Sequence, residues 1–486
     1  MNTGFLFLVA AMFPVNPAFA QEKFHEQVVA IAPGDNPDEI IWKAAHVVPS
    51  ARQLRWQELE FTVFIHFGMN TFTGREWGEK GTPPALFNPT ALDARQWARV
   101  AKNVGANLLI LVAKHHDGFC LWPTKYTEYS VKNSPWRQGK GDLVAEVAKA
   151  CKEAGIKLGI YLSPWDMNSP LYGSEAYNDY FVNQLTELLT NYGTIDEVWF
   201  DGACGEGPNG LKQKYDWMRY YRTVRELQPQ AVIAVTGPDV RWVGTESGYG
   251  RECEWSVVPL PPSSAAEIVA TGENSFNRNI LFPPAGDMMQ EDIGSREKIL
   301  KASALAWYPS EVDVSIRPGW FYHADQDSLV KSPEKLVDIW YSSVGRNSVL
   351  LLNIPPDKRG LIHENDIASL DGMKRILDAT FSKDLAEKAK ITRGKSSVHL
   401  ELPEAAIFDC ILIQEDISKG QRVEQFTVEI FDGKKWVGVF HGTTIGYKRL
   451  IRINPVNAAR IRLRITETRD HPNISAFKLF KSPAGN

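Results

Sequence analysis

Leu108-Leu-Ile-Leu-Val-Ala113 is an uninterrupted apolar run that follows a helical segment, Ala91 to Val104, and a helix-breaking glycine, Gly105. The apolar residues of the helical segment recur at helical spacing: Leu92, Trp97, Val100, Ala101 and Val104. A strand without a polar position is buried on both of its faces. That is typical of a parallel sheet that is covered by helices.

The same order of helix, glycine and strand returns further along the chain. The successive segments are Asp142–Ala154, Gly155, Ile156–Leu162, then Tyr177–Tyr192, Gly193, Glu197–Phe200, then Trp217–Leu227 and Ala231–Val235. Repeated over about residues 50 to 360, this pattern predicts an α/β fold with a (β/α)8-like (TIM-type) barrel. A doubly wound open sheet is the alternative, but no glycine-rich nucleotide-binding motif opens a helix here.

After residue 390 the pattern changes to strands separated by turn residues such as Asp432-Gly433. The expected strands are Ser397–Leu402, Phe408–Ile413, Phe426–Ile430, Arg449–Ile453 and Ala459–Ile465. They predict a small C-terminal β-sandwich. We therefore expect a signal segment over residues 1–20, a catalytic barrel over 21–365 and a β-sandwich over 366–486.

The N-terminus has the form of an export signal. Phe5 to Phe13 is a short apolar run, and Ala18-Phe19-Ala20 before Gln21 resembles a cleavage site, although no Lys or Arg precedes the run. The run is too short to span a bilayer, so no membrane span is expected. The sequence thus predicts cleavage after about Ala20 and a periplasmic or secreted protein.

Bulk composition restricts the class of partner. The net charge is −4 and the pI is about 6.2, which argues against a nucleic-acid partner. A neutral substrate fits this charge best, and the fifteen Trp would suit the apolar faces of sugar rings, although Trp residues also fill protein cores. The five cysteines are odd in number and widely spaced, which is typical of neither a disulfide framework nor a zinc site.

Unusual polar residues follow four of the predicted barrel strands. They are His66-Phe-Gly68, Lys114-His-His-Asp-Gly118, Ser163-Pro-Trp-Asp166 and Asp201-Gly202. A barrel brings the carboxyl ends of its strands together around one axis. We therefore expect these residues to form one site, although Asp201 taken alone could also be the N-cap of a helix.

Three of these segments, extended to Phe64-Ile-His-Phe-Gly68, Lys114-His-His-Asp-Gly-Phe119 and Val198-Trp-Phe-Asp-Gly202, resemble the core motifs of glycoside hydrolase family 29 α-L-fucosidases. Leu350-Leu-Leu-Asn-Ile354 matches as well, and the resemblance covers about Trp56 to Pro356. It implies a retaining exo-α-L-fucosidase that needs no cofactor and acts on fucosylated oligosaccharides or glycoconjugates. In that family the aspartate of the third motif is the nucleophile, which here is Asp201.

Beyond Asp201, the segments Arg241–Ser247 and Arg251–Ser256 resemble the subgroup that cleaves α-1,3 and α-1,4 linked fucose from branched sugars. That resemblance implies Glu246 as the general acid/base, with Glu252 and Glu254 as alternatives in the same loop. Two other functions stay open: a fucosidase of the relaxed-specificity subgroup, and a catalytically silent fucose-binding barrel protein.

The remaining candidates bind the sugar. Histidines and a glutamate would hydrogen-bond the ring hydroxyls, and tryptophans would face the methyl group of this 6-deoxy sugar; the residues are His66, Glu76, His115, His116, Trp199 and Trp320. Alternatively, the tryptophans belong to the core and Glu76 is a solvated loop carboxylate. No metal site is expected, because adjacent histidines point apart if their strand continues and no H-x-x-x-H helix is present. A metal-dependent barrel hydrolase, which chelation would inactivate, is the alternative.

The C-terminal segment resembles the discoidin-like β-sandwich that often accompanies these barrels. The likeness lies in Phe408–Ile417, Gly420–Arg422 and Phe426–Val428. Such modules either bind sugars or cap the barrel, and the second role is the one we expect here.

Overall fold

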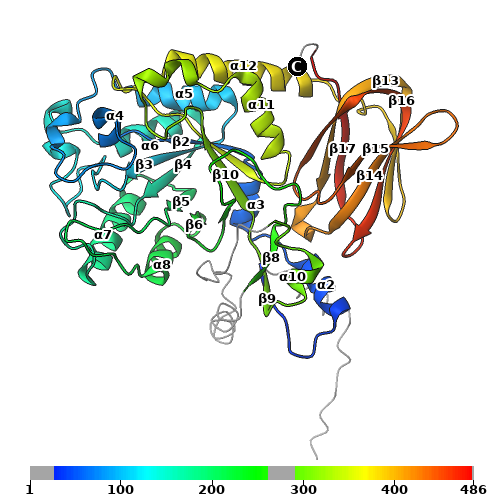
Figure 1. The fold of residues 1–486 in the computed structure, drawn as a ribbon, viewed down its shortest axis with the longest axis horizontal. Helices are drawn as coiled ribbons and strands as arrows, with labels where there is room; N and C mark the ends of the chain where they lie inside the picture. The colour runs from blue at the N-terminus through cyan, green and yellow to red at the C-terminus, as the bar shows by residue number, and fades with distance from the viewer. Residues whose placement is uncertain (1–26, 261–290, 484–486) are drawn as a thin grey trace, which may run out of the picture.

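The computed structural model describes residues 27–260 and 291–483, which form an α/β barrel beside an antiparallel β domain (Figure 1). The predicted export signal, residues 1–20, lies outside the described residues. Within those two ranges, none of the helices combines the length and apolar character that crossing a membrane requires.

The barrel is an eight-stranded sheet in which each pair of neighbouring strands is parallel. From one edge to the other, its strands are β6 (Val232–Val235), β5 (Glu197–Phe200), β4 (Lys157–Leu162), β3 (Leu108–Lys114), β2 (Phe61–Ile65), β11 (Val349–Asn353), β10 (Ser310–Ser315) and β7 (Arg241–Trp242). A parallel bridge between Ala234 and Val240 joins the two edges. The sheet is nearly closed, which confirms the predicted (β/α)8-like barrel and excludes the open doubly wound sheet.

Strand β3 shows why the barrel strands are apolar throughout. Its even-numbered residues from Leu108 to Val112 pack in the barrel interior. Its odd-numbered residues from Leu109 to Ala113 pack in the cluster between the sheet and the helices. Because both faces are buried, a polar side chain that must reach solvent or a ligand is confined to the strand's end.

Helices cover the outside of the barrel (Figure 1). The longer ones are α5 (Ala94–Val104), α6 (Leu143–Ala154), α7 (Ala176–Asn191), α8 (Trp217–Leu227), α11 (Pro333–Ser342) and α12 (Glu364–Phe381), and α3 (Ala51–Gln57) and α4 (Met69–Thr73) are short. Asp93, Asp142 and Asp216 cap the N-termini of α5, α6 and α8. Gly105 and Gly155 end α5 and α6 at φ values of 97° and 66°, in the left-handed region that favours glycine.

Helix α12 belongs to the barrel. Its Leu370, Met373 and Leu377 are part of the cluster between helices and sheet, and it lies against α5 and α11. The barrel core therefore extends beyond residue 365, where the sequence predicted the change to the β domain. The first strand of that domain, β12, begins at Lys390.

The β domain is antiparallel, with its own buried apolar core. Its strands are β12 (Lys390–Arg393), β13 (Ser397–Glu415), β14 (Val423–Phe431), β15 (Trp436–Gly442), β16 (Arg449–Thr468) and β17 (Ile474–Phe480). They lie in the order β12-β13-β16-β14-β15, with β17 also paired to β13. Four of the predicted strands merge into two, because β13 and β16 continue through register shifts such as the one between Glu401 and Ala406.

A small antiparallel sheet between the two parts was missed in the sequence. It contains β1 (Val28–Ala30), β9 (Ala304–Trp307) and β8 (Val257–Leu260), in that order, with α2 (Pro37–His46) and α10 (Arg296–Ile299) nearby (Figure 1). Val257 and Trp307 of this sheet share an apolar cluster with Ile417 of the β domain. The small sheet therefore joins the barrel to the β domain.

A buried ionic cluster secures the closing edge of the barrel. Asp239, between β6 and β7, accepts hydrogen bonds from Arg52 Nε (3.0 Å) and Ile233 N (2.8 Å) and pairs with Arg225. Burial raises the pKa of Asp239, but the two guanidinium groups outweigh burial and hold this pKa below its ordinary value. The cluster ties α3 and α8 to the strands that close the sheet.

We expect Asp239→Asn to lower the free energy of unfolding by about 3–5 kcal/mol at pH 7, because two guanidinium groups stay buried without their carboxylate. The folded-state pKa of Asp239 lies below its ordinary value of 3.8. Its ionic contribution is therefore complete above that pH and is lost as the pH falls through the folded-state pKa. Urea unfolding at pH 7 and pH 3 measures both effects.

The control is Asp378→Asn, which removes an exposed i,i+4 partner of Lys374 on α12. This variant should cost at most about 1 kcal/mol. Equal losses in the two variants would contradict a special role of the Asp239 cluster.

Candidate active site

Four predicted residues meet at the carboxyl face of the barrel. His66 follows β2, His115 and His116 follow β3, and Asp201 follows β5. The ring centroids of His66 and His115 are 5.7 Å apart, and those of His115 and His116 are 4.1 Å apart. His116 Nε2 lies 3.7 Å from Asp201 Oδ2. The structure thus brings all four residues into one continuous site.

The Asp201 carboxylate is held on both oxygens. Oδ2 accepts a hydrogen bond from the Tyr161 hydroxyl (3.0 Å), and Oδ1 accepts one from the Ala203 backbone N–H (2.7 Å). Burial and the negative charge of Asp201 raise the pKa of Tyr161 well above its ordinary value, so Tyr161 remains a donor. The interpretation of Asp201 as a helix N-cap is wrong, because the next helix, α8, is capped by Asp216.

The three histidines are buried and uncharged. Burial lowers the pKa of His66 to about 3, that of His115 well below its ordinary value, and that of His116 below it. The condition under which adjacent His115 and His116 would point apart is not met, because β3 ends at Lys114, and the centroids of the two rings are 4.1 Å apart. Within the part of the chain described, no cluster of three or more His, Cys, Asp or Glu is placed to hold a metal ion.

The partners of the rings determine which nitrogen carries the proton. His66 Nδ1 donates to Asn353 Oδ1 (2.9 Å), which leaves Nε2 as an acceptor. His116 Nδ1 donates to Ser163 Oγ (2.7 Å), whose own hydrogen goes to the Trp165 carbonyl (2.7 Å). His115 Nδ1 faces the amide nitrogen of Asn70 at 3.4 Å, so its Nε2 carries the proton. The site therefore offers a ligand both acceptors and a donor.

Glu76, Trp320 and Glu246 form a second connected group on the same face. Glu76 Oε2 accepts a hydrogen bond from Trp320 N (2.8 Å), and Trp320 Nε1 donates to Glu246 Oε2 (3.1 Å). The Trp320 ring packs on His66 with centroids 5.1 Å apart. Trp320 thus links the predicted acid/base to the histidines.

Trp199 lies deeper than the other predicted site residues. It is 6% exposed, stacks on Tyr161 at a centroid distance of 5.3 Å, and donates from Nε1 to Glu311 Oε2 (2.8 Å). This position is in the barrel interior, beneath Tyr161, as the alternative core interpretation predicted. Other aromatic rings lie beside the histidines: between ring centroids, Trp165 is 4.9 Å from His116, Trp77 is 6.3 Å from His116 and Phe321 is 5.1 Å from His115.

The two other glutamates of the Glu246 loop pair with arginines. Glu254 is 1% exposed and pairs with Arg241 and Arg251. Glu252 pairs with Arg346 and with Arg449 of β16, in the β domain. Both carboxylates are therefore engaged by arginines, and that of Glu252 reaches the β domain.

The geometry of this site agrees with the comparisons of the chain with known proteins. The family model for α-L-fucosidases matches residues 83–249 and 266–380. An α-L-fucosidase of Arabidopsis thaliana is 41% identical over 469 residues, which cover 89% of this chain and 87% of the plant protein. The chain belongs to the α-L-fucosidase family.

Solved α-L-fucosidase structures share the fold. A Bacteroides ovatus protein assigned as an α-L-fucosidase matches with a TM-score of 0.87 and 49% identity, over 95% of this chain and 79% of that one. A family 29 fucosidase of Ruminococcus gnavus, solved with fucose, matches with a TM-score of 0.77 and 29% identity, over 94% of this chain and 97% of that one. The predictions of an α-L-fucosidase, a glycoside hydrolase, and of its fold are confirmed.

Sequence reasoning missed Asn353, which connects two parts of this fucosidase site. Its Oδ1 accepts from His66, and its Nδ2 donates to the Trp320 carbonyl (2.8 Å) and to Ser315 Oγ (2.9 Å). Asn353 is fully buried at the end of β11. The signal was present, because Asn353 is the polar residue that ends the apolar run Leu350-Leu-Leu.

We expect Asn353→Ala to lower kcat/KM on an aryl α-L-fucoside by roughly 10- to 100-fold, because a buried N–H of His66 loses its acceptor and the Trp320 loop loses its donor. Asn353→Asp keeps the acceptor alone and should lose less. The exposed Asn133, which donates to the Glu128 carbonyl, supplies the control variant Asn133→Ala. A folded Asn353→Ala enzyme with wild-type kinetics would show that His66 and Trp320 are held by other contacts.

Proposed function

We propose that the protein is an exported, retaining exo-α-L-fucosidase that removes α-1,3/1,4-linked fucose from branched oligosaccharides by double displacement. The observation that carries the mechanism is the Asp201 carboxylate, fixed by Tyr161 and Ala203 at a strand end beside three uncharged histidines. An anionic oxygen held at a rigid position is what nucleophilic attack on a sugar requires.

In the first step, an oxygen of Asp201 attacks the anomeric carbon of fucose. Glu246 gives its proton to the glycosidic oxygen, the bond from that oxygen to the anomeric carbon breaks, and the remaining sugar leaves. In the second step, Glu246 takes a proton from water, and the water oxygen displaces Asp201 from the anomeric carbon. Two inversions give retention, and both carboxyl groups return to their starting protonation states.

Glu246 is supported as the acid/base by its contact with Trp320. The other two glutamates of the loop already serve arginines, since Glu254 pairs with Arg241 and Glu252 with Arg449. Glu246 is exposed at the tip of its loop, where it can meet a leaving sugar and then a water.

The uncharged histidines suit a neutral sugar. We propose that His66, His115 and His116 bind ring hydroxyls, each of which can both donate and accept a hydrogen bond. Glu76 accepts at the edge of this group, and the ring of Trp320 offers an apolar wall to the methyl group. Charged imidazolium groups would favour an anionic ligand, but burial lowers the pKa values of these histidines and so disfavours their charged form.

Two parts of the proposal rest on sequence resemblance. Export to the periplasm or beyond rests on residues 1–20, and the linkage preference rests on Arg241–Ser247 and Arg251–Ser256. The alternatives are a relaxed-specificity fucosidase and a silent fucose-binding barrel. Cell fractionation of the full-length chain tests export: mature protein with a new N-terminus near Gln21 outside the cytoplasm is expected, and uncleaved protein in the cytoplasm would contradict it.

For the catalytic pair, we expect Asp201→Ala to bind fucosylated oligosaccharide and to turn it over slower by orders of magnitude. Glu246→Ala should lose about 10²–10⁴-fold on the oligosaccharide, yet much less on an aryl fucoside whose leaving group needs no proton. The matched control is Glu252→Ala in the same loop, which should retain activity on both substrates. The roles of Glu246 and Glu252 would be exchanged if the second variant alone showed this selective loss.

For linkage, the wild-type enzyme is incubated with EDTA and either a branched α-1,3/4-fucosylated or an α-1,2-fucosylated trisaccharide, and free fucose is measured. Release from the branched sugar alone is the expected result. Release from both would favour the relaxed subgroup. Restoration of activity by a divalent metal after a complete loss in EDTA would favour a metal-dependent hydrolase, and no release under any condition would favour the silent barrel.

A further inference from the structure

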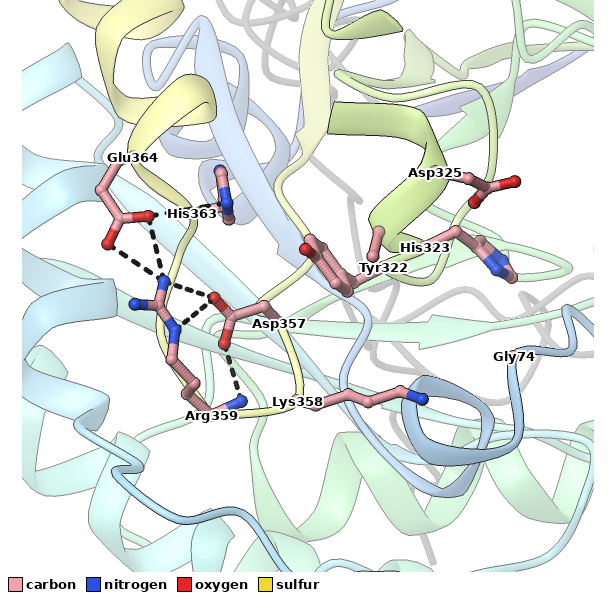
Figure 2. A pocket seen from close by; sticks show the side chains of 10 residues that line it. Gly74, Tyr322, His323, Asp325, Asp357, Lys358, Arg359, His363 and Glu364 are labelled. Carbon is pink, nitrogen blue, oxygen red and sulfur yellow. Dashed lines mark hydrogen bonds and ion pairs between the residues drawn. The ribbon is translucent and has the colours of Figure 1, made fainter. Parts of the chain in front are cut away.

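A cleft of about 510 Å³ lies on the same face of the barrel as the candidate active site, and most of its lining side chains are charged or aromatic. Figure 2 shows these side chains. Three loops line it: the one after α4 at Gly74, the one after β10 from Tyr322 to Asp325, and the one after β11 from Asp357 to Glu364. The volume is that of a site for a small ligand. None of the site residues predicted from the sequence lines this cleft.

The cleft contacts the candidate site through the side chains of His323 and Glu76. His323, which lines the cleft, contacts Glu76 Oε1 through its Nε2 at 2.7 Å. The other oxygen of Glu76 accepts from Trp320 N, within the catalytic group. The cleft therefore adjoins the candidate site at Glu76.

One side of the cleft is built from charges that already neutralise one another. Arg359 pairs with Asp357 through Nη2 and Oδ2 (2.6 Å) and with Glu364 through Nη2 and Oε2 (3.0 Å), and Figure 2 shows the three side chains gathered together. Because the guanidinium is shared between two carboxylates, little of its charge is available to a ligand. These three residues therefore line one side of the cleft with charges that are already paired.

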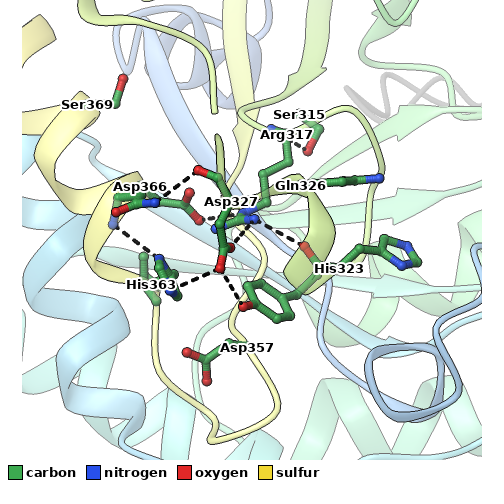
Figure 3. A network of polar contacts seen from close by, with 12 residues as sticks. Ser315, Arg317, His323, Gln326, Asp327, Asp357, His363, Asp366 and Ser369 are labelled. Carbon is green, nitrogen blue, oxygen red and sulfur yellow. Dashed lines mark hydrogen bonds and ion pairs between the residues drawn. The ribbon is translucent and has the colours of Figure 1, made fainter. Parts of the chain in front are cut away.

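The side of the cleft that contains Tyr322 is held in place by buried polar contacts. Arg317, whose side chain is fully buried, lies 4.7 Å from the ring centroid of Tyr322 and donates to Asp366 (3.0 Å) and Asp327 (2.9 Å). The Tyr322 hydroxyl donates to Asp327 Oδ2 (3.3 Å). Figure 3 shows this network beneath the loop that carries His323. A ligand would therefore meet a preformed surface, with little entropy to lose on ordering it.

Two charged side chains of the cleft are still available. Within residues 27–260 and 291–483, neither Lys358 nor Asp325 makes a hydrogen bond or an ion pair, and both are exposed. Figure 2 shows the Lys358 chain extending toward the Gly74 loop, away from the paired charges. An ammonium that donates and a carboxylate that accepts, on two of the loops that line one cleft, match the hydroxyl groups of a sugar.

The charge balance of the lining favours a neutral ligand over an anionic one. The lining has three carboxylates, Asp325, Asp357 and Glu364, against two cations, Lys358 and Arg359. An added sulfate or carboxylate would meet more negative than positive charge. Hydroxyl groups of an uncharged sugar carry no such penalty.

We propose that this cleft binds a non-fucose sugar residue of the oligosaccharide substrate, with Lys358 and Asp325 as its hydrogen-bonding partners. The proposal rests on the function proposed above, because it requires an oligosaccharide substrate. The Glu76–His323 pair is then the boundary between the fucose site and this second subsite. The cleft would contribute to the affinity for oligosaccharides and nothing to that for a fucoside with a small aryl leaving group.

The test compares Lys358→Ala, Asp325→Ala and the double variant with wild type on two substrates, the branched fucosylated trisaccharide and an aryl α-L-fucoside. We expect KM for the trisaccharide to rise about 5- to 30-fold in the double variant, with kcat and KM for the aryl fucoside within about twofold of wild type. The matched control is Lys374→Ala, which removes a partly buried lysine of α12 that pairs with Asp378, and it should leave the kinetics on both substrates unchanged.

Each outcome of this comparison either supports or contradicts the proposed subsite. An unchanged KM for the trisaccharide in the double variant overturns the subsite and leaves the fucosidase intact. An equal loss on both substrates also overturns it, because the two residues would then act on the fucose site. If wild type prefers the α-1,2-linked trisaccharide, the linkage proposal fails, and a selective KM rise on that sugar still supports the subsite. Wild type that cleaves the aryl fucoside and no oligosaccharide contradicts both proposals before any variant is made.

Discussion

Burial of the barrel strands on both faces is the constraint on which the rest of the structure depends. A polar group inside such a barrel needs a partner there, and the few that occur have one: Glu197 accepts from Trp56, Glu311 from Trp199 and Asp313 from Trp242. Burial raises the pKa of Glu197 to about 7 and the pKa values of Glu311 and Asp313 well above their ordinary value. Asp201 lies instead at a strand end, where its side chain is 25% exposed.

The same constraint explains how much of the fold and of the candidate site could be predicted from the sequence. A strand with both faces buried is apolar at each position, so the barrel and the polar residues that end its strands, Asp201 among them, could be predicted. Tyr161 could not, because its ring belongs to the apolar run Ile156–Leu162 and only its hydroxyl reaches Asp201. Nor could the small sheet, since β1 pairs with β9 at Ala304–Trp307, more than 270 residues away along the chain, and each strand is only three or four residues long.

Sequence order also could not decide among the three glutamates of one loop. Glu246, Glu252 and Glu254 lie within nine residues and are chemically alike. What separates them is the arginines that other parts of the chain bring: Arg241 reaches Glu254 from β7, and Arg449 reaches Glu252 from β16. Glu252 and Glu254 are thus held by arginines, whereas Glu246 contacts Trp320 at the exposed part of the loop.

These contacts also give the β domain a structural part in the catalytic unit. Gln421 Nε2 donates to the Glu254 carbonyl (3.0 Å), and Gln421 Oε1 accepts from Ser256 N (2.7 Å). Thr443 donates to the Glu252 carbonyl (2.9 Å). The returning half of the Glu246 loop is thus bound by the β domain, while its tip stays exposed. Glu246, the proposed acid/base, therefore lies on the exposed part of a loop whose other part is hydrogen-bonded to the β domain.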